Sequence, residues 1–239
     1  MEEKAFSSRE RVQGVLASIS EAAARARRDP SEVALMAVVK TRTPEEIAGI
    51  AEAGVTVFGE NRVQEGEAHL RALEPSFREG HRIHFIGRLQ ANKARKALAA
   101  FDSIDGLDGD ALALRLSTLA GQMGVTRDVM VEVNLGEESQ KGGVSPEEAP
   151  AFARRVAGLP HLRLTGLMGV PPLVEDPEAS RPYFRSLAKI FRDVRAILPD
   201  PDPFTNLSMG MSHDFHVAVE EGATLVRVGT ALFGPRRAP

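Results

Sequence analysis

The residues best suited to chemistry in this 239-residue chain are polar side chains that directly follow short apolar runs. Lys40 comes after the six apolar residues of ALMAVV (34 to 39). Partial desolvation there would favour the neutral amine, which can attack an aldehyde and form an imine. A lysine that ends a strand and extends its ammonium group to solvent is an equally good interpretation of this motif alone. The choice between an imine-forming lysine and a solvent-exposed lysine therefore depends on the other polar residues.

A second group of polar residues could hold a phosphate. Gly229-Thr230 lies between an apolar run and a predicted short helix, where backbone N–H groups and a hydroxyl are available. Ser208 and Ser212 come from the end of the neighbouring expected strand and could add hydroxyl donors. Because Ser212 also precedes His-Asp-Phe, it could be an ordinary helix N-cap, alone or together with the phosphate role.

Arg227 stands inside the apolar run TLVRVG (224 to 229). Burying a guanidinium is costly unless it meets an anion or a hydrogen-bond acceptor, so Arg227 needs a partner. That partner could be a ligand, or a carboxylate such as Glu132 or Glu60. Position in the sequence leaves both alternatives open.

Two further groups of polar residues favour structural interpretations. His213 and His216 are three residues apart on a predicted helix, but no third metal ligand is indicated, so a surface helix is preferred. A basic cluster, expected on the solvated face of one helix, consists of Arg88, Lys93, Arg95 and Lys96.

These residues need a scaffold that gathers the ends of the apolar runs. A first helix places Val12, Val15, Leu16, Ile19 and Ala23 on one face, and after it apolar runs alternate with helical segments. The expected strands are 34–39, 55–59, 83–87, 101–105, 129–133, 163–168, 204–209 and 224–229. The expected helices are one from Pro44 to before Gly54, then 61–74, 90–100, 109–122, 146–158, 178–197 and 213–221, with a long loop at 171–182.

This alternation predicts an α/β fold, a single TIM-like (β/α)8 barrel with an extra N-terminal helix. In such a barrel the carboxyl ends of the strands form the working face, which is where the polar residues fall. Length fits one domain over 1–239, since α/β barrels of about 250 residues form single domains.

Composition limits the classes of function. A net charge of −3 and 5% aromatic residues without Trp give no basis for nucleic-acid binding. Zero Cys excludes disulfides, thiolate metal sites and cysteine catalysis. The polar start and the lack of a long apolar window predict no membrane association. We therefore expect a cytoplasmic protein.

The ordered motifs of the chain resemble those of the pyridoxal phosphate homeostasis protein family, whose fold is the alanine racemase N-terminal barrel. The resemblance covers nearly the whole chain. Its segments are AVVKTRTPEEI (37 to 47), FGENRVQE (58 to 65), HFIGRLQANK (84 to 93), VNLGEESQKGG (133 to 143), GLMGVPP (166 to 172), LSMGMSHDF (207 to 215) and GATLVRVGTALFG (222 to 234).

The resemblance implies that Lys40 holds pyridoxal 5′-phosphate (PLP) as a Schiff base. It implies a phosphate site at Ser208, Ser212, Gly229 and Thr230, with Asn61 beside the cofactor. Arg227 would approach the pyridine nitrogen or the phosphate region, and the analogy with the racemase barrel favours the nitrogen. The chain departs from the family pattern at four positions. These are Arg62 in place of an aromatic residue, Ile83 in place of Trp, Gln140 in place of the Ser before Lys141, and His213 in place of Asp.

The resemblance also favours a carrier over an enzyme. An arginine partner would leave the ring nitrogen unprotonated and weaken the cofactor as an electron sink. Racemisation needs a second acid or base, which alanine racemases supply as a tyrosine from an additional domain, whereas this chain stops at Pro239 and has one tyrosine, Tyr183. We expect a protein of vitamin B6 homeostasis, with PLP-dependent apo-enzymes as partners. The alternatives are a small amino-acid racemase of fold type III and, third, a lysine-dependent aldolase barrel.

Overall fold

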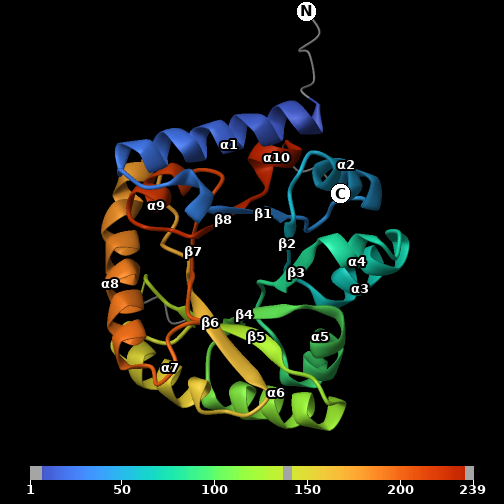
Figure 1. Cartoon of the computed structure of the whole chain (residues 1–239), viewed down its shortest axis with the longest axis vertical. Coiled ribbons are helices and arrows are strands. Elements are labelled where there is room, and N and C mark those ends of the chain that lie inside the picture. Colours follow the sequence, from blue (N-terminus) through green and yellow to red (C-terminus); the bar gives the residue numbers. More distant parts are fainter. Residues whose placement is uncertain (1–6, 137–141, 235–239) are drawn as a thin grey trace, which may run out of the picture.

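The fold is a closed barrel of eight parallel strands surrounded by helices, in a computed structural model that describes residues 7–136 and 142–234 (Figure 1). Each strand pairs with the next in the chain, and β8 closes the barrel against β1. The strands are β1 (Ala34–Val38), β2 (Val57–Glu60), β3 (Arg82–Phe85), β4 (Ser103–Leu107), β5 (Arg127–Val133), β6 (Leu162–Gly169), β7 (Asn206–Met211) and β8 (Leu225–Val228). The predicted (β/α)8 barrel is confirmed.

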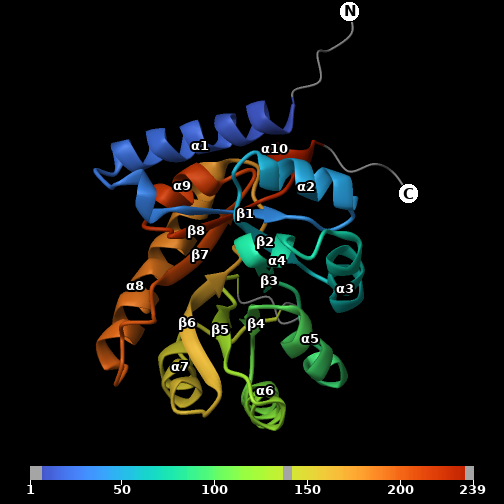
Figure 2. The ribbon, with the colours of Figure 1, turned by 45° about the vertical axis from the view of Figure 1, so that its right-hand side comes forward.

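Helices follow the strands and form a ring outside the barrel, as both ribbon views show (Figures 1 and 2). They are α1 (Ser8–Arg25), α2 (Pro44–Glu52), α3 (Val63–Ala72), α4 (Phe77–Gly80), α5 (Ala94–Ala100), α6 (Asp110–Met123), α7 (Ala149–Ala157), α8 (Arg181–Ile197), α9 (Phe215–Glu220) and α10 (Thr230–Phe233). Three short 3-10 helices are η1 (Pro30–Glu32), η2 (Ala91–Lys93) and η3 (Pro177–Ser180). The extra N-terminal helix α1 packs across α9, α10 and α2.

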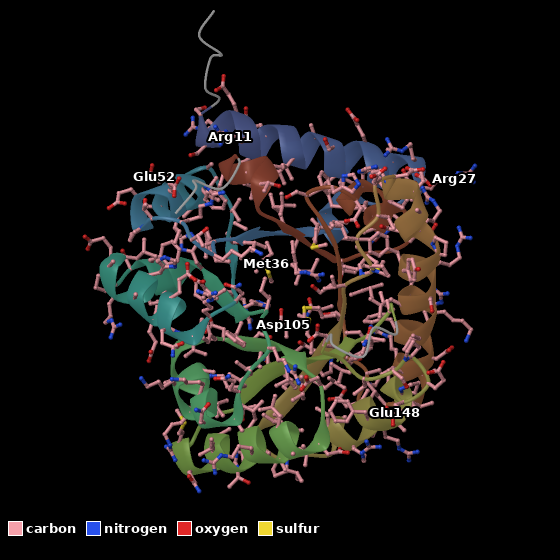
Figure 3. The ribbon with its side chains drawn as sticks, turned by 180° about the vertical axis from the view of Figure 1, so that it is seen from behind. Arg11, Arg27, Met36, Glu52, Asp105 and Glu148 are labelled. Carbon is pink, nitrogen blue, oxygen red and sulfur yellow. The ribbon has the colours of Figure 1, made fainter. Side chains whose placement is uncertain are left out.

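The core has two parts. The main cluster of buried apolar side chains lies between the strands and the helices. A small separate cluster is formed by Met36, Met130 and Leu225, which come from three different strands and meet inside the barrel. Figure 3 shows Met36 and Asp105 within the ring of strands, and both are fully buried.

Several boundaries correct the sequence predictions. The segment 171–182 is not one long loop, because η3 begins at Pro177 and α8 at Arg181. Leu16 is 43% exposed and so does not share the buried face of α1. The basic cluster does not lie on one helix: Arg88 precedes η2, Lys93 ends it, and only the remaining two residues of the cluster belong to α5. The short helix α4 was not predicted.

In the part of the chain that is described, no helix is both long and apolar enough to cross a membrane. Two residues named for the family resemblance, Gln140 and Lys141, lie outside the described residues.

Candidate ligand site at the carboxyl ends of the strands

A cavity of about 580 Å³ opens at the carboxyl ends of the strands, and we call it the Lys40 cavity. Loops after β1, β2, β3, β6, β7 and β8 contribute to its wall. Six of the seven residues predicted for the site line it together; they are Lys40, Asn61, Ser212, Arg227, Gly229 and Thr230. The exception is Ser208, which is fully buried next to the cavity wall.

Lys40 lies in the turn that follows β1, where it is half-buried. The turn is held from two sides. The backbone N–H of Thr41, a residue with φ of 61°, donates to the Glu65 carboxylate of α3. The buried Arg42 donates to the Gly234 carbonyl at 2.9 Å. These contacts limit the positions that the Lys40 backbone can take.

Ser212 joins the loop after β7 to the loop after β8. Its Oγ accepts a hydrogen bond from the Gly229 N–H at 3.1 Å and a longer one from the Ala231 N–H at 3.4 Å. The alternative of Ser212 as a helix N-cap is wrong, because α9 begins at Phe215 and Asp214 occupies its N-cap position. Since the Oγ accepts from Gly229, its own O–H can donate into the cavity.

Arg227 is 4% exposed and finds its acceptors within the protein. Its Nη1 donates to Ser208 Oγ at 2.6 Å, and its Nη2 donates to the Gly169 carbonyl at 2.9 Å. It forms no ion pair within residues 7–136 and 142–234, so the alternative of a salt bridge to Glu132 or Glu60 is not found there, and Glu60 contacts His69 instead. Ser208 is thus placed to hold Arg227 and not to face the cavity.

Burial dominates the electrostatics around Arg227. It lowers the pKa of Arg227, and the charges of Asp105, Glu132 and Asp214 oppose that shift. Burial likewise raises the pKa of Glu132, with a further increase from the Asp108 carboxylate. An arginine stays protonated even so, because its ordinary pKa is above 12. The wall of the cavity therefore carries a fixed positive charge.

Asn61 also lines the Lys40 cavity, directly after β2, the strand that pairs with β1. Its Oδ1 is buried and has no hydrogen-bond partner within the described residues. Gly87 comes so close to it that an added Cβ would lie 2.3 Å from the Asn61 carbonyl oxygen. A larger residue at position 87 would displace this loop, so the glycine sets the place of Asn61.

Metal binding has no support in the described residues. They contain no group of three or more His, Cys, Asp or Glu side chains that could hold a metal ion. The prediction that His213 and His216 share a helix is wrong, because His213 lies before α9. The His213 Nε2 contacts the Glu175 carbonyl at 2.9 Å.

Comparisons with known proteins give a consistent family. Residues 16–237 match the model of the alanine racemase N-terminal domain. The pyridoxal phosphate homeostasis protein of Aquifex aeolicus (strain VF5) is 42% identical over 95% of this chain and 98% of its own length. The protein of the same name from Escherichia coli (strain K12) is 38% identical over 91% of this chain and 92% of its own length.

A solved structure agrees with these relatives. PipY of Synechococcus elongatus PCC7942, in its form with PLP bound, is 35% identical and superimposes with a TM-score of 0.76. The match covers 90% of this chain and 100% of that one. The chain therefore belongs to the pyridoxal phosphate homeostasis protein family and has the alanine racemase N-terminal fold.

Proposed function

We propose that this protein binds PLP in the Lys40 cavity, as a Schiff base on Lys40, and serves cytoplasmic vitamin B6 homeostasis as a carrier or regulator. One observation carries the proposal: Lys40 shares a cavity of about 580 Å³ with the hydroxyl-bearing residues Ser212 and Thr230 from the neighbouring loops. Drug-sized ligands occupy cavities of about 300 to 1,000 Å³. The structure of PipY with PLP bound supports the same cofactor.

The groups in the cavity fit PLP chemically. When bound, PLP supplies an aldehyde for the amine and a phosphate that needs several hydrogen-bond donors. Ser212 O–H and Thr230 O–H would bind the phosphate, and Gly229, whose N–H donates to Ser212 Oγ, would hold that serine in place. Asn61 lines the same cavity and would lie beside the cofactor. We assign Ser208 the indirect role of positioning Arg227.

A carrier role is supported by what Arg227 can and cannot do. A guanidinium donates hydrogen bonds and accepts none, so it cannot keep a pyridine nitrogen protonated. The tyrosine Tyr183 packs against the core from α8 and does not line the Lys40 cavity. An amino-acid racemase, the second candidate, would need another group as its second acid or base.

The protein loaded with PLP should restore activity to a PLP-dependent apo-enzyme and should not racemise alanine at enzymatic rates. Transfer would be followed as recovered activity of the apo-enzyme, with free PLP at the same concentration as the reference. Racemisation would be followed as D-alanine formed from L-alanine. Sustained racemisation that disappears in Lys40→Ala would overturn the carrier role in favour of the racemase.

A further inference from the structure

A second and larger cavity, of about 840 Å³, opens at the same end of the barrel. We call it the Arg88 cavity. Its wall comes from the loops after β2, β3 and β4 and from the helix starts that follow them. Asn61 lines both cavities, so the two adjoin. The proposed function makes no use of this second space.

The Arg88 cavity concentrates positive charge. Among its described lining residues, Arg62, Arg88 and Lys93 are cationic and only Asp108 is anionic. The chain as a whole has a net charge of −3, so this excess is local. Asp108 neutralises it weakly, since its Oδ2 lies 3.8 Å from the Arg88 Nε. At this separation, and with the Arg88 side chain exposed, the pair contributes little energy.

Two helix starts add hydrogen-bond donors to the same wall. The first turn of α3 lines the cavity through Val63 and Gln64, and the first turn of α6 lines it through Ala111 and Leu112. In neither helix does a side chain cap the first backbone N–H groups. These N–H groups carry partial positive charge and favour an anion, as the cationic side chains do.

Part of the wall of the Arg88 cavity is apolar. Phe85, Leu89 and Leu112 are buried residues that line it. A ligand that matches the cavity therefore has an anionic group and an apolar or aromatic body. Phosphate suits the anionic end, because its three oxygens can accept from several guanidinium and backbone donors at once.

We propose that the Arg88 cavity is a second binding site, which takes a small organic phosphate monoester. The phosphate lies against Arg62, Arg88 and Lys93, and the organic body lies over Phe85 and its apolar neighbours. This site does not depend on a Schiff base at Lys40, so either proposal can be wrong without affecting the other.

The chain offers a matched control for the cations. Arg95 and Lys96 belong to the same stretch of basic residues but do not line the Arg88 cavity. Arg95 donates to Gln122 at 2.7 Å, and Lys96 lies 3.8 Å from Glu67. The double variant Arg95→Ser/Lys96→Ser removes the same net charge from this side of the protein without touching the cavity.

The test is a titration of the full chain with phenyl phosphate, followed through the backbone amide signals of Val63, Gln64 and Ala111 in nitrogen-15 NMR spectra. Saturable shifts are expected in the wild type. Arg62→Ser/Arg88→Ser should weaken binding roughly tenfold to a hundredfold, since it removes two charge-assisted contacts. Both arginines are exposed, so the fold should be kept.

The control double variant should bind phenyl phosphate within about twofold of the wild type, as expected for charges outside the site. Glutarate, a dicarboxylate probe, should bind more weakly than phenyl phosphate. No saturable shift at the three amides would overturn the site. If both double variants lost the same affinity for phenyl phosphate, the binding would be general charge attraction and the proposed site would be wrong. If glutarate bound more tightly than phenyl phosphate, the assignment of a phosphate ligand would be wrong. Shifts at Gly229 and Thr230 report the Lys40 cavity separately.

Discussion

At the scale of single residues, Arg227 lines the Lys40 cavity and also donates hydrogen bonds to Ser208 in β7 and Gly169 in β6. We predict that Arg227→Gln lowers the free energy of unfolding of the apo-protein by about 1.5 to 3 kcal/mol, because charged hydrogen bonds are lost. PLP affinity should fall by roughly tenfold to a hundredfold as well. Urea unfolding and PLP titration measure the two effects. Arg192→Gln, an exposed arginine on α8, is the control.

If Arg227→Gln destabilised the apo-protein and left PLP affinity unchanged, Arg227 would be only a structural residue. The bond to Ser208 gives a further check. Ser208→Ala should produce a smaller loss of stability of the same kind, since it removes one of the two acceptors of Arg227.

A second prediction for single residues concerns the buried Glu60 and the half-buried His69, whose Oε1 and Nδ1 lie 2.5 Å apart. The bond to Glu60 raises the pKa of His69. Burial raises the pKa of Glu60 more than this bond lowers it. Both groups hold protons more tightly in the folded chain than in the unfolded chain, so folding takes up protons and stability falls as pH rises.

The stabilising contribution of His69 should be complete below about pH 6.5, the ordinary value for a histidine, and lost as pH rises through its raised pKa. Urea unfolding of the wild type should therefore give a smaller free energy at pH 9 than at pH 6. Glu60→Gln/His69→Gln should flatten this pH dependence, and His213→Gln, an exposed histidine, should not. An unchanged slope in the double variant would show that this pair does not titrate in that range.

At the scale of elements, the helix α1 is attached to the barrel through one face. Ile19 is 2% exposed and Leu16 is 43% exposed, although the helical period suggests the same face for both. We predict that Ile19→Ala lowers the free energy of unfolding by about 2 to 5 kcal/mol. Leu16→Ala should change it by no more than about 0.5 kcal/mol. Equal effects, measured by denaturant unfolding, would contradict this packing of α1.

The order of the elements could be predicted from the sequence, because each buried strand is a short apolar run and each helix has a longer period. The boundaries could not, since they depend on distant contacts. β4 begins at Ser103, two residues later than predicted, and Asp102 before it accepts a hydrogen bond from the Ile83 N–H of β3 at 2.8 Å. That bond holds the preceding turn against the neighbouring strand.

The residues of the site were also predictable only in part. Lys40 could be predicted because the apolar run before it is continuous in the sequence. The role of Ser208 was not, since its bond to Arg227 spans 19 residues and arises where β7 lies beside β8. Glu65, which holds the turn after Lys40, gave no sequence signal for that contact. Residue type and position in the sequence suggest candidate site residues, but their contacts with one another are set by the pairing of strands in the closed barrel.

At the scale of the whole molecule, closure of the barrel places the first strand, β1, beside the last strand, β8. β1 carries Lys40 in the turn that follows it, and β8 carries Arg227 and leads into Gly229. Because β1 and β8 are hydrogen-bonded neighbours, the amine and the expected phosphate site lie on adjacent loops of one face. Lys40 is therefore the residue on which PLP binding depends most.

Borohydride reduction of the protein mixed with PLP, followed by peptide mass mapping, tests this central claim most directly. Borohydride converts an imine into a stable amine and so marks the lysine that formed it. We predict a pyridoxyl adduct on the peptide that contains Lys40 and its loss in Lys40→Ala. An adduct found only on another lysine, such as Lys141, with Lys40 unmodified, would contradict the account.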